Sequence, residues 1–325
     1  MREPLSKLEA WRVFEAVART GSLSRAAIEL DMSVSKTSRT LARLEAQLGE
    51  ALFVRASRPL KPTPLAAAAL QRLQALLPAW REFEDFVQAS AGLRRVVRLS
   101  TPAGIGRFYL NEQIAQYRKI DPALVIEAFV DEDVEALLHR TIDVAFLPYT
   151  PEARQWEGQG GALAVYPAMR GFTVPLASPA YLRTRARPRT PQDLKRHTLI
   201  LKTGGKFPTA THLVCRGQRQ PVRFEHVVLH HDMLNIKDAA LRGFGIALDI
   251  PLGMVLEELR EKSLVPVLDG WHRDYWNYSI VTRSESGPHT DIGRFAAWYA
   301  KRATEEINSR RDEGFRILGI DPAQI

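Results

Sequence analysis

The chain has 325 residues, of which 45% are hydrophobic and 25% are charged, and its formal net charge is +8. This composition is typical of globular domains and argues against a disordered or fibrous chain, and the length predicts two or three domains. The surplus of cations favours polyanionic partners, nucleic acid above all, although many basic enzymes never touch DNA. The single cysteine, Cys215, excludes an intrachain disulfide and a multi-thiolate zinc site, and we expect it to be a small buried or half-buried side chain.

The N-terminal segment has no long apolar run, because its apolar residues alternate with charged ones. No signal peptide is apparent, nor any apolar stretch of about 18 residues that could span a bilayer. A lone cysteine also fits a reducing compartment. We therefore expect a cytoplasmic protein without a membrane partner.

The first fifty residues show the periodicity of three consecutive helices. Apolar residues recur at helical spacing from Leu8 to Ala18, and Ser22 or Ser24 can then cap a short second helix. After a tight turn at 31–33, a third helix carries an apolar stripe at Val34, Thr37, Leu41, Leu44 and Leu48. Two short helices joined by a three-residue turn are helix-turn-helix geometry.

The opposite face of the third helix carries short hydroxyl groups and cations, with no acid before Glu45. This face comprises Ser35, Lys36, Ser38, Arg39, Ala42 and Arg43. A solvated helix usually mixes charges of both signs, whereas a face of one sign suits a phosphate-lined groove. A solvated helix of a small bundle is the open alternative.

A short two-stranded wing is predicted directly after these helices, from segments 52–55 and 61–63. Its tip carries Arg55, Arg58 and Lys61, which are placed to reach phosphate groups or the minor groove beside the third helix.

Residues 8–66 resemble the DNA-binding domain of the LysR-type transcriptional regulators. The resemblance implies that the third helix is the recognition helix, with base-reading positions at Val34, Ser35, Ser38 and Arg39, and that Arg55 is the wing arginine. The segments that carry it are 14–18, 21–27, Ser38-Arg39, Leu44-Glu45, Leu48-Gly49 and 52–55. The predicted DNA-binding residues are Ser35, Lys36, Ser38, Arg39, Arg43, Arg55 and Arg58. Lys36 and Val34 depart from the usual family residues, which leaves the preferred DNA sequence open.

A long helix is predicted to begin at Thr63-Pro64, where a threonine cap precedes a proline in the first turn. Helical spacing of Leu70, Leu73, Leu77, Trp80 and Val87 persists to Gln88, and about 25 residues at 1.5 Å each give roughly 38 Å. The apolar stripe needs a partner: a second copy of the chain, or the chain itself. The resemblance favours a second copy, and hence a homodimer or homotetramer.

From Val96 onward, strands alternate with helices, which implies a mainly parallel sheet with ligands outside the carboxyl ends of its strands. The expected strands are 96–99, 124–130, 142–147, 172–177, 199–201, 227–229, 264–268 and 278–281. The expected helices are 106–118, 133–139, 233–241 and 292–306.

This region resembles the effector-binding domain of the same family, an α/β fold of two periplasmic-binding-protein-like subdomains. The segments that carry the resemblance are 143–145, 177–182, 191–194 and 243–251. We therefore predict a winged helix-turn-helix domain over 1–65, a linker helix and hinge over 66–92, an effector-binding domain over 93–309, and a C-terminal extension over 310–325. Subdomain I would comprise 93–165 and 268–309, and subdomain II would comprise 166–267.

The resemblance also implies a small-molecule effector in the cleft between the subdomains, at strand ends and helix starts, where free N–H groups suit carboxylates. The matching positions are Ser100, Thr101, Pro102, Val130, Asp131, Lys202, Thr203, His231 and Asp249. Ser100 and Thr101 could equally be helix caps, and Lys202 could begin an ordinary polar loop. An aspartate in the cleft could repel an anion or bind a cation, so the ligand class stays open.

We expect neither an enzyme nor a bound cofactor or metal. No Gly-x-Ser-x-Gly elbow or His-Glu-x-x-His motif occurs, and the adjacent His230 and His231 would point to opposite faces of a strand. Segment 271–276 is rich in aromatic side chains, and it is more typical of a subdomain or dimer contact than of a ligand site.

The sequence thus predicts a transcriptional regulator that binds double-stranded operator DNA, responds to a small molecule and has RNA polymerase as a further partner. Two alternatives are a regulator without a small-molecule response and a ligand-binding protein of the same fold that has lost DNA binding.

Overall fold

The computed structural model describes residues 8–30, 32–54, 57, 59–90, 95–130, 134–149, 163–204, 210–273 and 276–322. The chain forms two compact units, Met1–Leu93 and Arg94–Ile325. Each unit has an apolar core of its own.

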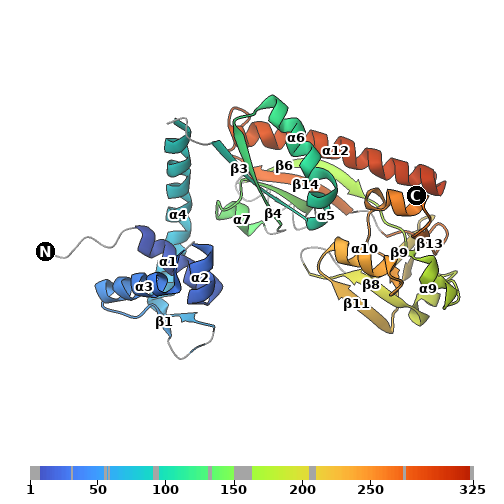
Figure 1. Ribbon diagram of the computed structural model, residues 1–325, viewed down its shortest axis with the longest axis horizontal. Coiled ribbons are helices and arrows are strands. Elements are labelled where there is room, and N and C mark those ends of the chain that lie inside the picture. The colour runs from blue at the N-terminus through green and yellow to red at the C-terminus, as the bar shows by residue number, and fades with distance from the viewer. Residues whose placement is uncertain are drawn as a thin grey trace. The chain divides into compact units, whose positions relative to one another are not determined.

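The N-terminal unit consists of helices packed at one end of a long helix, with a small antiparallel sheet beside them (Figure 1). Its elements are α1 (Leu8–Thr20), α2 (Leu23–Glu29), α3 (Val34–Leu48), β1 (Phe53–Val54), β2 (Lys61–Pro62) and α4 (Pro64–Ser90). Phe14, Leu44 and Leu52 are fully buried in its core. The predicted helices and the wing therefore form as expected.

Local capping residues set the ends of these helices. The Ser22 hydroxyl caps α2, and the Ser33 hydroxyl accepts the Lys36 N–H at 3.2 Å to cap α3. Gly49 ends α3 in the left-handed region at φ 77°. Thr63 begins α4 by accepting the Ala66 N–H at 3.3 Å. Because each signal lies within a few residues of the helix that it bounds, the sequence alone could locate them.

The C-terminal unit contains two five-stranded sheets and a separate hairpin. The first sheet has the order β4-β3-β5-β14-β6. Its strands are β3 (Arg95–Thr101), β4 (Leu124–Val130), β5 (Val144–Tyr149), β6 (Leu163–Gly171) and β14 (Trp276–Arg283). β3 pairs in parallel with β4 and β5, whereas β14 runs antiparallel to β5 and β6.

The second sheet has the order β11-β8-β12-β7-β13, and β9 and β10 form the hairpin beside it. The strands are β7 (Leu176–Ala177), β8 (Thr198–Lys202), β9 (His212–Cys215), β10 (Gln218–Pro221), β11 (His226–His230), β12 (Ile246–Ala247) and β13 (Val265–Pro266). Parallel pairing of β8 with β11 and β12 gives this sheet its α/β character.

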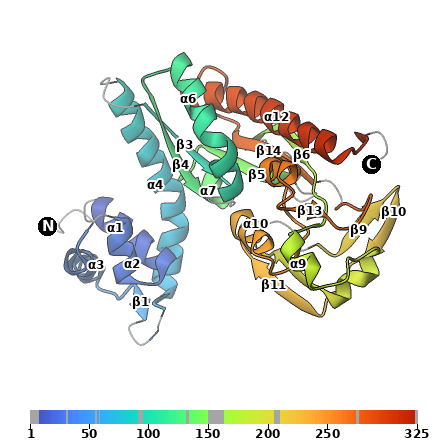
Figure 2. The same ribbon diagram turned by 45° about the vertical axis from the view of Figure 1, so that its right-hand side comes forward.

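Helices cover both sheets. They are α5 (Ala103–Ile105), α6 (Asn111–Ile120), α7 (Glu135–Leu138), α9 (Pro179–Arg183), α10 (Met233–Leu241), α11 (Leu256–Arg260) and α12 (Asp291–Leu318). The shorter helical turns are η1 (Gly106–Leu110, π-helical), η2 (Pro191–Arg196) and η3 (Leu252–Met254). Figure 2 shows α12 lying along the first sheet beside α6, and it contacts β6, β14 and η3.

Two segments carry the chain between the sheets. Segment 172–175 leads from β6 to β7, and segment 267–275 leads from β13 back to β14. The sequence placed the first crossing near residue 165 and a strand over 172–177. The crossing lies later than expected, because β6 runs to Gly171 as the edge strand of the first sheet. The strand expected over 172–177 is also shorter, because within that stretch the strand is Leu176–Ala177.

Candidate DNA-binding surface and ligand sites

Helix α3 presents the predicted polar face to solvent. Ser35, Lys36, Ser38, Arg39 and Arg43 are all exposed. The opposite face, with Thr37, Leu41 and Leu44, is buried against the core of the N-terminal unit. The helix is thus fixed by its apolar stripe, and its cations remain accessible.

The cations of α3 differ in their partners. The Arg39 Nε–H donates to the Ser35 carbonyl at 3.3 Å, which holds the side chain along the helix. Lys36 Nζ lies 2.7 Å from Glu9 Oε1 of α1. Within the described part of the chain, no acidic side chain forms an ion pair with Arg39 or Arg43. These two arginines therefore have charge available for an anionic partner.

The wing docks against the turn between α1 and α2. The Leu60 N–H donates to the Gly21 carbonyl at 3.0 Å. Gly21 has φ +64°, and a Cβ there would lie 2.7 Å from Pro59 Cβ, so a side chain does not fit. Lys61 is exposed on β2. The predicted wing cations Arg55 and Arg58 lie outside the described residues.

Helix α4 carries an exposed apolar stripe formed by Leu76, Trp80, Phe83 and Val87. Their exposed fractions are 56%, 41%, 54% and 46%, and their spacing of four, three and four residues places them on one face of the helix. The predicted stripe members Leu70 and Leu73 instead pack against the core of the N-terminal unit. The C-terminal half of α4 therefore offers an apolar face that these four side chains expose.

In the C-terminal unit, the first three predicted effector positions follow one another at the end of β3. Ser100, Thr101 and Pro102 are buried, and Pro102 precedes the short helix α5. Val130, at the end of edge strand β4, is 73% exposed. Asp131 lies outside the described residues.

The predicted positions Lys202, Thr203, His231 and Asp249 belong to the second sheet and its loops. Asp249 is fully buried, forms an ion pair with Arg273, and accepts the Lys202 N–H at 2.7 Å. Burial raises the pKa of Asp249, and the neighbouring Arg273 opposes that rise. His231 is exposed, and a Cβ on Gly204 would meet its ring at 2.4 Å. Asp249 thus links the segments that carry Lys202 and Arg273 inside the protein.

Of the predicted effector positions, Pro102 and Lys202 line a common pocket. Its volume is about 20 Å³, which is room for about one water and far less than the roughly 300 Å³ at which small-molecule sites begin. Met254 and Tyr278, which the sequence did not suggest, share this lining. No local motif identifies these two residues, because only the pairing of the subdomains brings them to the cleft.

Among the described residues, the two walls of the cleft contact each other near Gly104 and Met254. Met254 Sδ and Cε lie so near Gly104 that a Cβ there would meet them at 3.1 and 3.0 Å. Lys237 Nζ donates to the Met254 carbonyl at 2.8 Å and stands 4.8 Å from the centre of the Phe108 ring. A ligand can occupy the space between Gly104 and Met254 only if these contacts separate.

Fold and surface together define a class of protein in which a helix-turn-helix unit is joined to a two-subdomain ligand-binding unit. The family model for bacterial regulatory helix-turn-helix proteins of the lysR family matches residues 8–67, and the model for the LysR substrate binding domain matches residues 90–304. The chain therefore belongs to the LysR family of transcriptional regulators. No helix in the described segments is both long and apolar enough to cross a membrane.

Similar proteins span nearly the whole chain. The HTH-type transcriptional regulator YhjC of Escherichia coli is 27% identical over 300 residues, which cover 91% of this chain and 97% of YhjC. The probable regulator LtrA of Klebsiella pneumoniae is 28% identical over 283 residues, 82% of this chain and 84% of LtrA.

Among solved structures, a full-length variant of AphB is similar with a TM-score of 0.66 at 20% identity, covering 92% of this chain and 98% of that one. The full-length Vibrio cholerae virulence activator AphB is similar with a TM-score of 0.58 at 20% identity, covering 97% and 99%. At this level of identity, the likeness is one of fold.

Proposed function

We propose that α3 enters the major groove of operator DNA, with Ser38 and Arg39 at the bases and Ser35 beside them. Lys36 and Arg43, together with Arg55 and Arg58 of the wing, would contact phosphates. An arginine can form two hydrogen bonds with a guanine edge, and cations beside it neutralise phosphates without reading sequence. The observation that carries the proposal is the exposed face of α3, on which Arg39 and Arg43 have no acidic partner among the described residues.

A homodimer accounts for the exposed stripe on α4. Four large apolar side chains at coiled-coil spacing are costly to leave in water, and a second α4 packed against them would bury all four. A dimer would place two α3 helices at successive major grooves, about 34–36 Å apart, on a pseudo-palindromic operator. Pairing of two such dimers would give a tetramer.

A small molecule entering the cleft between the subdomains would act by favouring a separated arrangement over the closed one. It can do so only to the extent that it binds the two arrangements with different affinity. The contacts of Met254 with Gly104 and of Lys237 with Phe108 across the cleft support the proposal of a closed arrangement. RNA polymerase is the expected further partner of the DNA-bound dimer.

Binding to DNA from upstream of the gene itself tests the proposal. Fluorescence anisotropy of a labelled duplex would be recorded across a salt series for the native chain, Arg39→Ala and Arg223→Ala. Arg223 is exposed and lies in the C-terminal unit, so its variant controls for the loss of one positive charge.

The native chain and Arg223→Ala should bind the operator with steep salt dependence, whereas Arg39→Ala should lose about 1–3 kcal/mol at the operator and little on random DNA. Equal losses for both variants, or indifference to DNA sequence, would contradict the assignment of α3 as the recognition helix.

A further inference from the structure

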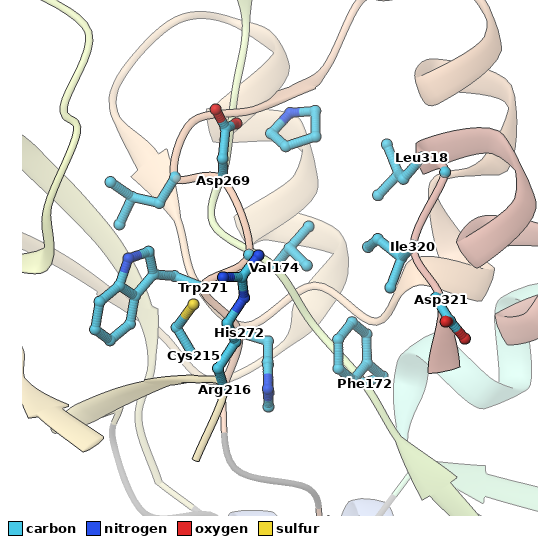
Figure 3. Close-up of a pocket in the computed structure, with 14 residues that line it drawn as sticks. Phe172, Val174, Cys215, Arg216, Asp269, Trp271, His272, Leu318, Ile320 and Asp321 are labelled. Carbon is cyan, nitrogen blue, oxygen red and sulfur yellow. The ribbon is translucent and has the colours of Figure 1, made fainter. Parts of the chain in front are cut away.

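A second cavity, of about 350 Å³, lies where both crossing segments meet the end of α12 (Figure 3). We call it the hinge pocket. Four segments line it: Phe172 and Val174 from the first crossing, Pro266 and residues 268–272 around the second, the hairpin turn at Cys215 and Arg216, and residues 318–321 at the end of α12. None of the predicted effector positions belongs to it.

The far wall of the pocket comes from the part of the chain whose role the sequence did not indicate. Helix α12 continues to Leu318, and Gly319 reverses the chain at φ +64° so that the Ile320 N–H donates to the Phe315 carbonyl at 2.9 Å. The Phe315 ring packs edge-on against Phe172, with centroids 4.8 Å apart. Leu318 and Ile320 are therefore held as fixed walls.

The end of α12 is also anchored to the second subdomain. The Arg310 Nε–H donates to the Gly253 carbonyl at 2.9 Å, and Glu313 pairs with Arg260. Gly314 lies so near Leu252 that a Cβ would meet it at 2.9 Å. A molecule in the hinge pocket would thus touch both crossing segments and the helix that spans them.

The lining combines an apolar interior with one accessible cation. In Figure 3, Phe172, Leu318 and Ile320 stand on one side, and Arg216 extends from the opposite side next to Val174. Within the described residues, no acidic side chain forms an ion pair with Arg216. The pocket therefore offers apolar contact beside a positive charge.

The backbone at Arg216 is unusual for an arginine. Arg216 has φ 47° and Gly217 has φ 75°, and Cys215 pairs directly with Gln218, so these two residues form a two-residue hairpin turn of the type that prefers Asn-Gly. A non-glycine residue in this region is strained, so the surrounding structure must hold it there. The turn is held to the second crossing, since Val214 exchanges backbone hydrogen bonds of 2.7 and 2.9 Å with His272.

Two acids lie at the rim. The Asp269 side chain is 98% exposed and has Arg187 at 3.8 Å, so solvent and a cation already compensate its charge. Asp321 lies on the Ile320 side of the pocket, across from Arg216. An anion is therefore favoured on the Arg216 side.

We propose that the hinge pocket is a second ligand site, and that it binds a small organic acid whose aromatic or branched apolar body lies on Phe172, Val174 and Ile320 while its carboxylate meets Arg216. The cavity of about 350 Å³ falls in the range of small-molecule sites, roughly 300–1,000 Å³. A bound acid favours the arrangement of crossing segments in which this cavity is formed. The site depends neither on an opened cleft nor on DNA.

Fluorine NMR of 4-fluorophenylacetate with the full-length chain tests this site. The acid should bind, whereas 4-fluorophenylacetamide and 4-fluorophenethylamine, which present a neutral and a cationic group on the same ring, should bind at least tenfold more weakly. Arg216→Gln and Ile320→Asp should each weaken binding of the acid at least tenfold. Arg223→Gln, an exposed arginine outside the pocket, should bind as the native chain does.

Equal binding of the acid by Arg216→Gln and the native chain would overturn the proposal, as would preference for the amine. Gly104→Val adds a side chain in the cleft, and Gly104 does not line the hinge pocket. If this variant no longer binds the acid, the probe binds in the cleft and the proposal is overturned. Operator binding is measured separately with Arg39→Ala, so a failure of the proposed function leaves this result unchanged.

Discussion

Arginines occur in two opposite settings in this protein. Arg39 and Arg43 stand exposed on α3, and no acid pairs with them in the segments that the structure describes. In the C-terminal unit, Arg273 is buried against Asp249. Removing a charge from water costs several kcal/mol unless a partner compensates it. Arg273 therefore serves to compensate Asp249 inside the protein, whereas Arg39 and Arg43 are accessible to an anionic partner in solution.

A second buried carboxylate, Asp143, is likewise paired with arginine inside the protein. Asp143 accepts the Arg98 backbone N–H at 2.8 Å and lies 3.4 Å from the Arg283 guanidinium. Burial raises the pKa of Asp143, and its arginine neighbours oppose the rise. Asp143 joins β3, β5 and β14 and is not available to a ligand. Charge count alone cannot separate such structural ion pairs from a binding surface; burial and pairing can.

The largest effect should come from breaking the buried pair. Asp249→Ala removes the carboxylate partner of Arg273 in a buried setting, and it should lower the free energy of unfolding of the C-terminal unit by about 3–5 kcal/mol. Urea denaturation followed by circular dichroism measures this. The double variant Asp249→Ala, Arg273→Met should recover part of the loss, because it no longer buries a charge without its partner. A single variant as stable as the native chain would mean that Asp249 is not a structural residue.

A smaller effect is expected for an ion pair that is only partly buried. Arg95 donates to Asp291 at 2.7 Å and to Asp121 at 2.7 Å, and the hydrogen bond from Arg95 is the main reason why the pKa of Asp291 is lowered from 3.8. A lowered pKa in the folded state contributes stability above the unfolded value, and that contribution is lost as the pH falls through the folded value.

Asp291→Asn should therefore cost about 1 kcal/mol near neutral pH, and the difference from the native chain should shrink as the pH falls below 3.8. Urea denaturation from pH 3 to pH 7 checks both statements. Asp238→Asn, which removes a carboxylate from an exposed pair with Arg242, serves as the control and should change stability little at any pH. A pH-independent cost at position 291 would assign the effect to packing.

The smallest effect concerns the exposed face itself. Glu9 Oε1 lies 2.7 Å from Lys36 Nζ and places a negative charge beside α3. Glu9→Gln should strengthen operator binding, because Lys36 would become available to phosphate. The gain should be about 0.5 kcal/mol, because an exposed ion pair contributes little free energy. Fluorescence anisotropy at low salt would detect the change. Weaker binding would show that Glu9 positions Lys36 for its DNA contact.

Local signals explain why most of the N-terminal unit was predictable. Caps at Ser22, Ser33 and Thr63, and the stripe of α3, all act within one or two helical turns. Strands β3, β4 and β8 and helix α10 were also anticipated, because buried strands and an amphipathic helix leave their pattern in a short window. The hairpin of β9 and β10 is not predicted, since each strand has only four residues and β10 is polar.

The effector positions were harder to predict because they depend on contacts between distant segments. The resemblance implies nine residues in one cleft, and of these Pro102 and Lys202 line one small pocket together. Asp249 lies inside an ion pair, and Val130 lies at an exposed strand end. Strand register and subdomain contact decide which side chains meet, and neither is encoded in a local motif.

The sequence by itself determined the helix-turn-helix, the exposed cations of α3 and the alternation of strands and helices, because these follow from periodicity and capping over a few residues. Tertiary structure alone decided that α12 continues to Leu318, that Met254 packs against Gly104, and that Arg216 faces a cavity built from four distant segments. The physical reason is that a cavity exists only where separate parts of the chain pack imperfectly, and no single part carries that information.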